Sequence, residues 1–131
     1  MARAKLPSLF DGAVWLADDN AVKLPPHGVR VFHDVRPVVI LHAEVLGARL
    51  PGDCVFAIPC SGSFDGELGA FDLVLPAGTA PFDARTMVFV SLLQKLRRTD
   101  LRRLTGQLSP PAFREVCALA RQRLTQPLLW P

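Results

Sequence analysis

The sequence predicts a small, mainly β domain in which a strongly curved antiparallel sheet or barrel is followed by one C-terminal helix. Short apolar runs between turns rich in glycine and proline predict about five strands, and a capped helical pattern occurs only near the end. The 131 residues suffice for a single domain, predicted to span residues 1–131 with its core at about 12–124. Because half of the residues are hydrophobic and 21% are charged, general disorder is excluded.

Three strands are predicted in the first half of the chain. Ala13–Ala17 is a short apolar run, and Pro37–His42 is rich in β-branched residues typical of a buried strand. Between them, residues 18–34 are polar and predict a long exposed loop, a feature that is often functional. The third strand, Cys54–Cys60, contains Pro59 near its end, which predicts an edge strand or a bulge.

The second half of the chain is predicted to continue the sheet after a loop over Ser61–Gly69. The alternating pattern of Phe71–Leu75 predicts a strand. Thr86–Leu96 fits both a helix and a strand, and its Thr, Val and Phe content favours a strand.

A helix is predicted to start after Ser109, which is followed by two prolines, and to end before Pro127. Apolar residues recur there at helical spacing on one face: Phe113, Val116, Cys117, Ala120 and Leu124. Three arginines are expected off that face: Arg114, Arg121 and Arg123.

Charge is distributed unevenly along the chain. Residues 1–84 hold 6 Lys and Arg against 10 Asp and Glu, a net charge of −4, whereas residues 85–131 hold 9 against 2, a net charge of +7. A basic half favours a polyanion or an acidic protein as partner, although a solvated helix face with a basic tail gives the same pattern. Apolar stretches are too short for a membrane span, and three cysteines without a CxxC pair indicate a reduced, cytoplasmic protein.

Motifs for metal, serine-hydrolase and phosphate-loop chemistry are missing from the sequence. The three histidines have no metal-ligand spacing, and Ser61 lies outside a GxSxG elbow. Arg36 stands directly before Pro37, which favours extended geometry at a strand entrance. Its planar guanidinium could bind a phosphate, or it could pair a local carboxylate such as Asp34.

Several segments resemble those of the PemK/MazF toxins and occur in the same order, from residue 12 to about 124. They are the segments GAVWL at 12–16, RPVVIL at 36–41, IPCS at 58–61, LQKLRRTDLRRL at 93–104 and GQLS at 106–109. The resemblance implies an SH3-like or CcdB-like curved barrel that forms a homodimer. It implies the toxin of a type II toxin–antitoxin pair, neutralised by an antitoxin with an acidic flexible segment.

The activity implied by the resemblance is metal-independent, sequence-specific endoribonuclease cleavage of single-stranded RNA. No cofactor is needed, because the 2′-OH of the RNA attacks its own phosphate and leaves a 2′,3′-cyclic phosphate. The family's catalytic positions correspond here to Arg36 and Ser61.

Further site residues are expected around this pair. Arg97 and Lys95 are candidates for binding the RNA backbone, and two loop phenylalanines for base stacking are Phe32 and Phe64. The family's Asp-Gln pair is replaced by Gln94 and Lys95, so an acid that serves as a base in some members is gone. The candidates to replace it as proton acceptor are His33 and Asp34. The alternatives are a CcdB-like toxin that binds protein without catalysis, or a degenerate binding module on the same fold.

Overall fold

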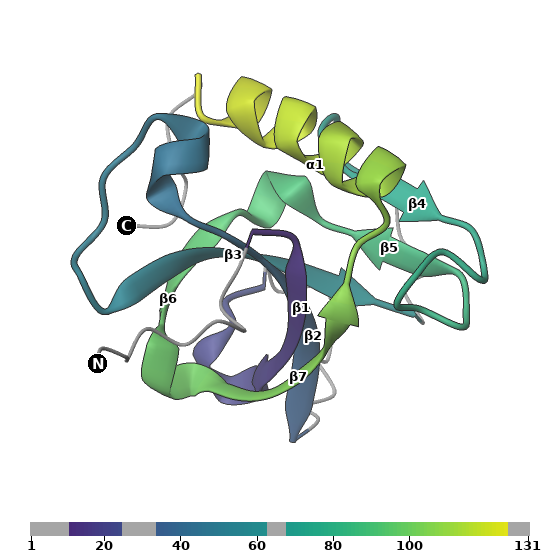
Figure 1. Ribbon diagram of the computed structural model, residues 1–131, viewed down its shortest axis with the longest axis horizontal. Helices are drawn as coiled ribbons and strands as arrows, with labels where there is room; N and C mark the ends of the chain where they lie inside the picture. Colours follow the sequence, from purple (N-terminus) through teal and green to yellow (C-terminus); the bar gives the residue numbers. More distant parts are fainter. Residues whose placement is uncertain (1–10, 25–33, 63–67, 126–131) are drawn as a thin grey trace.

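Seven strands and one α-helix make up the fold in the computed structural model, which describes residues 11–24, 34–62 and 68–125 (Figure 1). The strands are β1 (Ala13–Asp18), β2 (Val35–Leu41), β3 (Cys54–Ser61), β4 (Leu73–Leu75), β5 (Thr86–Val88), β6 (Gln94–Arg97) and β7 (Leu101–Gln107). The helix is α1 (Pro110–Arg123). Four short 3-10 helices are η1 (Asp19–Ala21), η2 (Ala43–Leu46), η3 (Val90–Leu92) and η4 (Arg98–Asp100).

The strands form one antiparallel sheet in the order β4-β5-β3-β2-β1-β7, with β6 also pairing with β3. Among the described residues β6 and β7 do not pair, so the curved sheet stays open between them. Helix α1 lies across one side of the sheet (Figure 1). The predicted curved sheet with a C-terminal helix is therefore confirmed.

Strand β3 is the centre of the sheet because it changes partner along one edge. Its first half pairs with β6 from Cys54 to Ala57, and its end pairs with β5 at Cys60 and Ser61. Pro59 lies in the gap between these partners, where its carbonyl accepts a hydrogen bond from Phe89 N at 2.9 Å. Because the N side of Pro59 faces this gap, its missing N–H removes no hydrogen bond between strands. Strand β3 is central in the sheet, so it is not the edge strand that was predicted as the alternative to a bulge.

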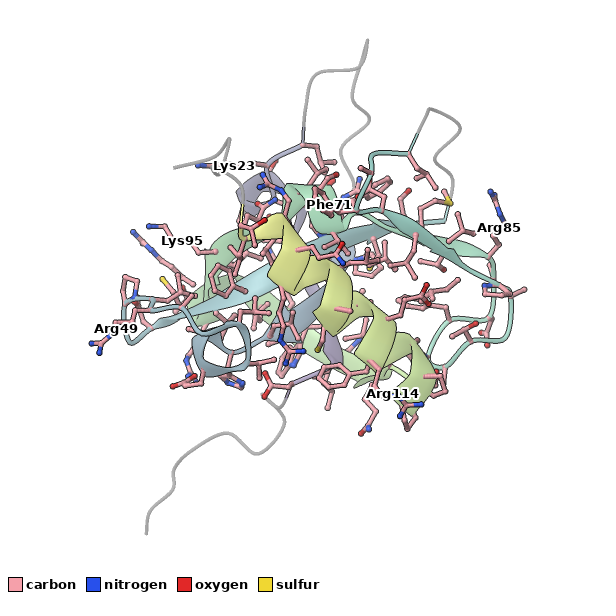
Figure 2. All side chains as sticks on the ribbon, turned by 90° about the horizontal axis from the view of Figure 1, so that it is seen from above. Lys23, Arg49, Phe71, Arg85, Lys95 and Arg114 are labelled. Atoms are coloured by element: carbon pink, nitrogen blue, oxygen red, sulfur yellow. The ribbon has the colours of Figure 1, made fainter. Side chains whose placement is uncertain are left out.

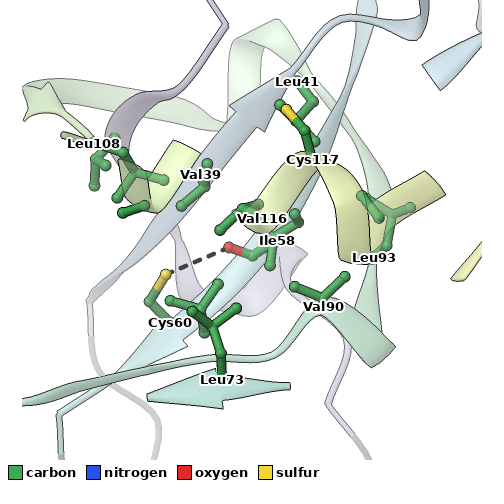
Figure 3. Packing of buried hydrophobic residues seen from close by; sticks show 14 of the residues in the cluster. Val39, Leu41, Ile58, Cys60, Leu73, Val90, Leu93, Leu108, Val116 and Cys117 are labelled. Atoms are coloured by element: carbon green, nitrogen blue, oxygen red, sulfur yellow. Dashed lines mark hydrogen bonds between the residues drawn. The ribbon is translucent and has the colours of Figure 1, made fainter. Parts of the chain in front are cut away.

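Both faces of the sheet are buried, which explains the nearly continuous apolar runs of β2 and β3. The helix-side cluster contains alternate strand residues and the apolar stripe of α1, including Val39, Ile58 and Val116 (Figure 3). The opposite-face cluster consists of Ala13, Ala17, Val22, Val38, Ile40, Val55, Ala57 and Leu96. Because successive strand residues point to opposite faces, one strand serves both clusters.

Two strand predictions were wrong or incomplete. Thr86–Leu96 is not one strand but β5, η3 and β6, because the chain must leave the end of β3 and rejoin its beginning. Strand β7 was missed because it is mostly exposed and lacks an alternating apolar pattern. It lies at the edge of the sheet, where it pairs with β1.

The predicted helix is confirmed, with two corrections. Ser109 is the N-cap residue, but its side chain makes no capping hydrogen bond. Arg123 does not lie off the apolar face; it is only 3% exposed, and its Nε donates to the carbonyl of Ser91 at 3.0 Å. The Ser91 amide and hydroxyl in turn donate to Asp72, so the C-terminal end of α1 is tied to η3 through buried polar contacts.

Gly12 provides a test of how the start of β1 packs under α1. Its φ is +85°, and a Cβ there would lie 2.9 Å from Cδ1 of Phe113. Gly47 has φ +66° with nothing within 4 Å of its Cβ position, so it is a matched control. In denaturant unfolding, Gly47→Ala should lower the free energy of unfolding by about 1 kcal/mol through backbone strain. Gly12→Ala should lower it by about 2–4 kcal/mol, because overpacking against Phe113 adds to the strain. Equal losses would contradict the tight Gly12–Phe113 contact.

Candidate functional site

Arg36 extends from β2 on the same face as Val38 and Ile40. It pairs in register with Ala17 of β1, and this position puts its guanidinium beside the first residue of η1. The side chain is 11% exposed, so most of the arginine is withdrawn from water. The site begins where β1 ends and β2 starts.

The guanidinium of Arg36 is held by two acceptors. Its Nε donates to Oδ1 of Asp19 at 2.7 Å, and its Nη1 donates to the carbonyl of Cys60 at 3.3 Å. The Asp19 side chain is 0% exposed. A charged pair this poorly solvated is strongly coupled, and removal of either partner leaves an uncompensated buried charge. The arginine is therefore fixed in orientation.

The third nitrogen of the guanidinium, Nη2, is not part of these two bonds. Nη2 of Arg36 makes no hydrogen bond to the described residues. Among the described residues, the one buried polar side-chain atom without a hydrogen bond is Nε of Arg98, not Nη2 of Arg36. Nη2 therefore takes no part in the contacts that hold the side chain in place. An arginine fixed through Nε and Nη1 keeps the N–H donors of Nη2, which are suited to bind an oxyanion.

Ser61 lies next to this arginine. The β2–β3 register pairs Val38 with Pro59, and continuing it by two residues on each strand places Arg36 opposite Ser61. Both then project from the same face of the sheet, where directly opposed Cβ atoms are about 4.5–5.5 Å apart. The bond from Arg36 to the carbonyl of Cys60 independently places the guanidinium beside Ser61. The structure thus brings together the two residues expected to be catalytic.

Asp19 is the site residue that the sequence analysis missed. It lies in the segment predicted to be an exposed loop, yet it is fully buried and Val22 is only 2% exposed. The prediction failed because a polar segment can be buried when its side chains are paired. The arginine pairs this carboxylate rather than Asp34, which is exposed and whose carbonyl accepts from Asp19 N at 3.3 Å. His33, Phe32 and Phe64 lie outside the described residues.

The candidate RNA-binding residues Lys95 and Arg97 are exposed but lie at the other end of β3. They pair with Phe56 and Cys54, whereas Ser61 ends the strand. At about 3.3 Å per residue, Arg97 is roughly 20 Å along β3 from Ser61 and Arg36. They are not part of the Arg36 site.

Arg85 is a cation near Ser61 that the sequence did not single out. A Cβ at Gly62, the residue after Ser61, would lie 3.8 Å from the carbonyl of Arg85. The Arg85 side chain is exposed and lies at the opposite end of the molecule from Lys95 (Figure 2). Its only sequence signal was its place at the start of the basic half.

The thiol of Cys60 does not provide a nucleophile. Burial raises its pKa to about 12, with Arg36 opposing that shift, and the sulfur lies 3.7 Å from the carbonyl of Ile58 (Figure 3). A thiol with this pKa is protonated at neutral pH. Within the described ranges, no group of three His, Cys, Asp or Glu side chains is arranged to hold a metal ion.

Solved structures that superpose on this chain include proteins described as an endoribonuclease and as MazF toxins. An endoribonuclease from a mycobacterial species superposes with a TM-score of 0.61 at 12% identity, covering 98% of this chain and 100% of that chain. The Mycobacterium tuberculosis toxin MazF-mt6 gives 0.57 at 18% identity, covering 88% and 98%, and MazE–MazF from Deinococcus radiodurans gives 0.57 at 18%, covering 89% and 95%. The chain has the MazF fold.

At these identities the MazF fold is a structural likeness. No protein-family model matches the chain, and no curated protein matches it in sequence. The fold implied by the sequence resemblance is thus confirmed. No helix in the described part of the chain is long and apolar enough to cross a membrane.

Removal of Asp19 should destabilise the protein strongly. Asp19→Ala leaves Arg36 buried without its counter-charge, so urea unfolding should show a loss of about 3–5 kcal/mol. Replacing both partners, as in Asp19→Leu with Arg36→Met, should recover most of this loss because no buried charge remains. Asp18→Ala is the matched control, since water screens the partly exposed Asp18–Arg102 pair and the bond from Asn20 N to Asp18 that is also lost is worth only about 1 kcal/mol. A loss no larger than that of the control would contradict the coupled pair.

Cys60 should resist alkylation in the folded protein. At pH 8, iodoacetamide should modify the partly exposed Cys54 well before Cys60, because Cys60 is buried and its pKa of about 12 leaves almost no thiolate. Mass spectrometry of tryptic peptides over time measures both sites. Rapid modification of Cys60 without unfolding would show that this end of β3 opens readily.

Proposed function

We propose that this protein is the toxin of a toxin–antitoxin pair and an endoribonuclease that cleaves single-stranded RNA. The observation that carries the proposal is Arg36, which is held through Nε and Nη1, has no hydrogen bond from Nη2 to the described residues, and lies beside Ser61. The MazF fold, shared with proteins named as endoribonucleases and toxins, supports the same activity.

The proposed reaction uses the RNA as its own nucleophile. The 2′-oxygen loses its proton and attacks the adjacent phosphorus, the bond to the 5′-oxygen of the next nucleotide breaks, that oxygen takes up a proton from water, and a 2′,3′-cyclic phosphate remains. Arg36 would bind a non-bridging phosphate oxygen through Nη2 and stabilise the charge that develops in the transition state. The Ser61 hydroxyl would donate a second hydrogen bond to the phosphate. These steps need no metal or cofactor, because neither proton transfer nor charge stabilisation requires one.

The proton from the 2′-OH needs an acceptor near Arg36. Asp34 is exposed, and its backbone lies against Asp19, so its carboxylate is the described candidate. His33 remains a candidate from the sequence. Asp19 itself is fully buried and binds Arg36, so its role is to hold the arginine rather than to take the proton.

Substrate and partners follow from the same proposal. Arg85 would contact the RNA backbone close to the cleaved bond, while Lys95 and Arg97 would bind only a more distant part of the strand. Phe32 and Phe64 remain proposed base-stacking residues. One solved structure with this fold is an endoribonuclease in complex with its cognate antitoxin. We expect a similar antitoxin here, with an acidic segment, and a homodimer in the cytoplasm that recognises a specific RNA sequence.

One observation favours a second candidate function, a CcdB-like toxin that binds protein without catalysis. Arg36 is 11% exposed and already has a carboxylate partner, as expected also for an arginine that only stabilises the fold. The two functions differ in whether Nη2 binds phosphate.

RNA cleavage in EDTA by purified protein separates these functions. The wild-type protein should cut long single-stranded RNA and leave 2′,3′-cyclic ends. Arg36→Ala should lower kcat about 10²–10³-fold, as loss of a transition-state donor does. Arg36→Lys should restore little, because an ammonium lacks the planar fork that bonds Asp19 and Cys60 together.

Arg103→Ala is the matched control, since Arg103 is an exposed arginine on β7. It should keep near-normal kcat and lose at most some salt-dependent RNA affinity. Equal cleavage by the wild-type and Arg36→Ala proteins would contradict the assignment of Arg36. A lack of cleavage on several RNAs, together with growth arrest on expression, would favour the protein-binding toxin.

A further inference from the structure

Gln94 is a buried polar side chain that has no place in the proposed chemistry. It begins β6, pairs in register with Ala57, and is 7% exposed. It projects to the same face of the sheet as Leu96, a member of the opposite-face cluster that also contains Val22. Buried amides are retained where all their hydrogen bonds can be made.

The Gln94 amide bonds both the backbone N–H and the backbone carbonyl of Lys23. Oε1 accepts from Lys23 N at 2.8 Å, and Nε2 donates to Lys23 O at 2.9 Å and to Leu92 O at 3.0 Å. The first two bonds reproduce the pattern that a neighbouring strand would provide. They attach the segment after β1 to the start of β6, 71 residues further along the chain.

This segment carries the partner of the proposed catalytic arginine. Lys23 follows Val22, which is buried in the opposite-face cluster and whose N–H donates to Asp19 O at 3.3 Å. Asp19 bonds Arg36 through its side chain and lies in η1, outside the regular strands. The position of its carboxylate therefore depends on two anchors: the bond from Asp19 N to the carbonyl of Asp34 and the attachment of the segment Asp19–Lys23.

We propose that Gln94 is a positioning residue that fixes this segment so that Asp19 holds the Arg36 guanidinium in its reactive orientation. The catalytic consequence rests on the proposed function, whereas the effect on the ion pair does not. The site then consists of a chain of contacts from Gln94 through the Lys23 backbone and Asp19 to Arg36.

The chemistry of the amide makes this role specific. A primary amide offers an acceptor and donors at once, so it can bond the N–H and the C=O of one residue. Leucine offers neither. An ionised glutamate accepts from Lys23 N but repels the carbonyls of Lys23 and Leu92, and a protonated glutamate regains one donor. In Gln94→Glu, the side chain should therefore hold the Lys23 backbone at low pH, where the carboxyl is protonated, and release it at high pH.

The first test measures the ion pair without RNA. The hydrogen-exchange rate of the Arg36 Nε–H, followed by NMR, reports how firmly Asp19 holds it. Relative to the wild-type protein at the same pH, Gln94→Leu should exchange at least 10-fold faster. Ser91→Ala is the control, because it removes a different polar contact, to Asp72 at 2.7 Å, and should change the Arg36 rate less than twofold.

The second test is rescue of the Gln94→Glu variant by protonation. It keeps the proposal testable even where the Gln94→Leu protein fails to fold. Burial favours the neutral form of the carboxyl that Gln94→Glu introduces, so the clamp is present below the pKa of this carboxyl and lost as pH rises through it. The Arg36 rate should match the wild type at pH 5 and exceed it at least 10-fold at pH 8. An Arg36 rate unaffected by Gln94→Leu, or a Gln94→Glu effect that is the same at both pH values, would overturn the proposal.

RNA cleavage then tests the catalytic consequence. Gln94→Leu should lower kcat about 10-fold with little change in KM, because the substrate-binding surface remains. Faster exchange of the Arg36 Nε–H in Gln94→Leu with an unchanged kcat would refute the claim that Gln94 positions a catalytic group. A wild-type protein that cuts no RNA, while the exchange results hold, would refute the proposed function and leave the Gln94 anchor intact.

Discussion

The buried ion pair between Asp19 and Arg36 is the interaction on which the site depends. An isolated arginine withdrawn from water at this position would be unstable, and the carboxylate of Asp19, at 2.7 Å, compensates its charge. The pair also joins the end of β1 to the start of β2, so it fixes the backbone while it orients the guanidinium. Because Nε and Nη1 are engaged, Nη2 is the part of the side chain offered to a ligand.

The antiparallel register of β2 and β3 explains why this pair lies beside Ser61. It brings the end of β3 to the start of β2, while on its other edge β3 leaves β6 and joins β5. The carbonyl of Cys60 then bonds Arg36, and Ser61 follows directly. The same change of partner separates the two groups of cations, since Arg85 accompanies β5 and Lys95 accompanies β6 (Figure 2).

Apolar runs and turn residues were sufficient to predict β1, β2, β3 and α1, because burial on both faces of the sheet leaves a strong local signal. Strand β7 and the division of Thr86–Leu96 could not be predicted, since they depend on which strands pair across the sheet. Arg36 and Ser61 were proposed as site residues from short motifs, and the structure places them side by side. Asp19 was not, because nothing local distinguishes a carboxylate that is buried by a partner 17 residues away from one in an exposed loop.

The central claim is that Arg36 binds RNA phosphate through Nη2 while Asp19 retains Nε. NMR of the arginine side chains during titration with a non-cleavable single-stranded RNA, 2′-O-methylated at every position, tests it most directly. We expect the Arg36 Nη signals to shift and saturate while its Nε–H stays protected, and the Arg103 signals to shift little. An Arg36 guanidinium that is unchanged at saturating RNA, while arginines elsewhere shift, would contradict the account.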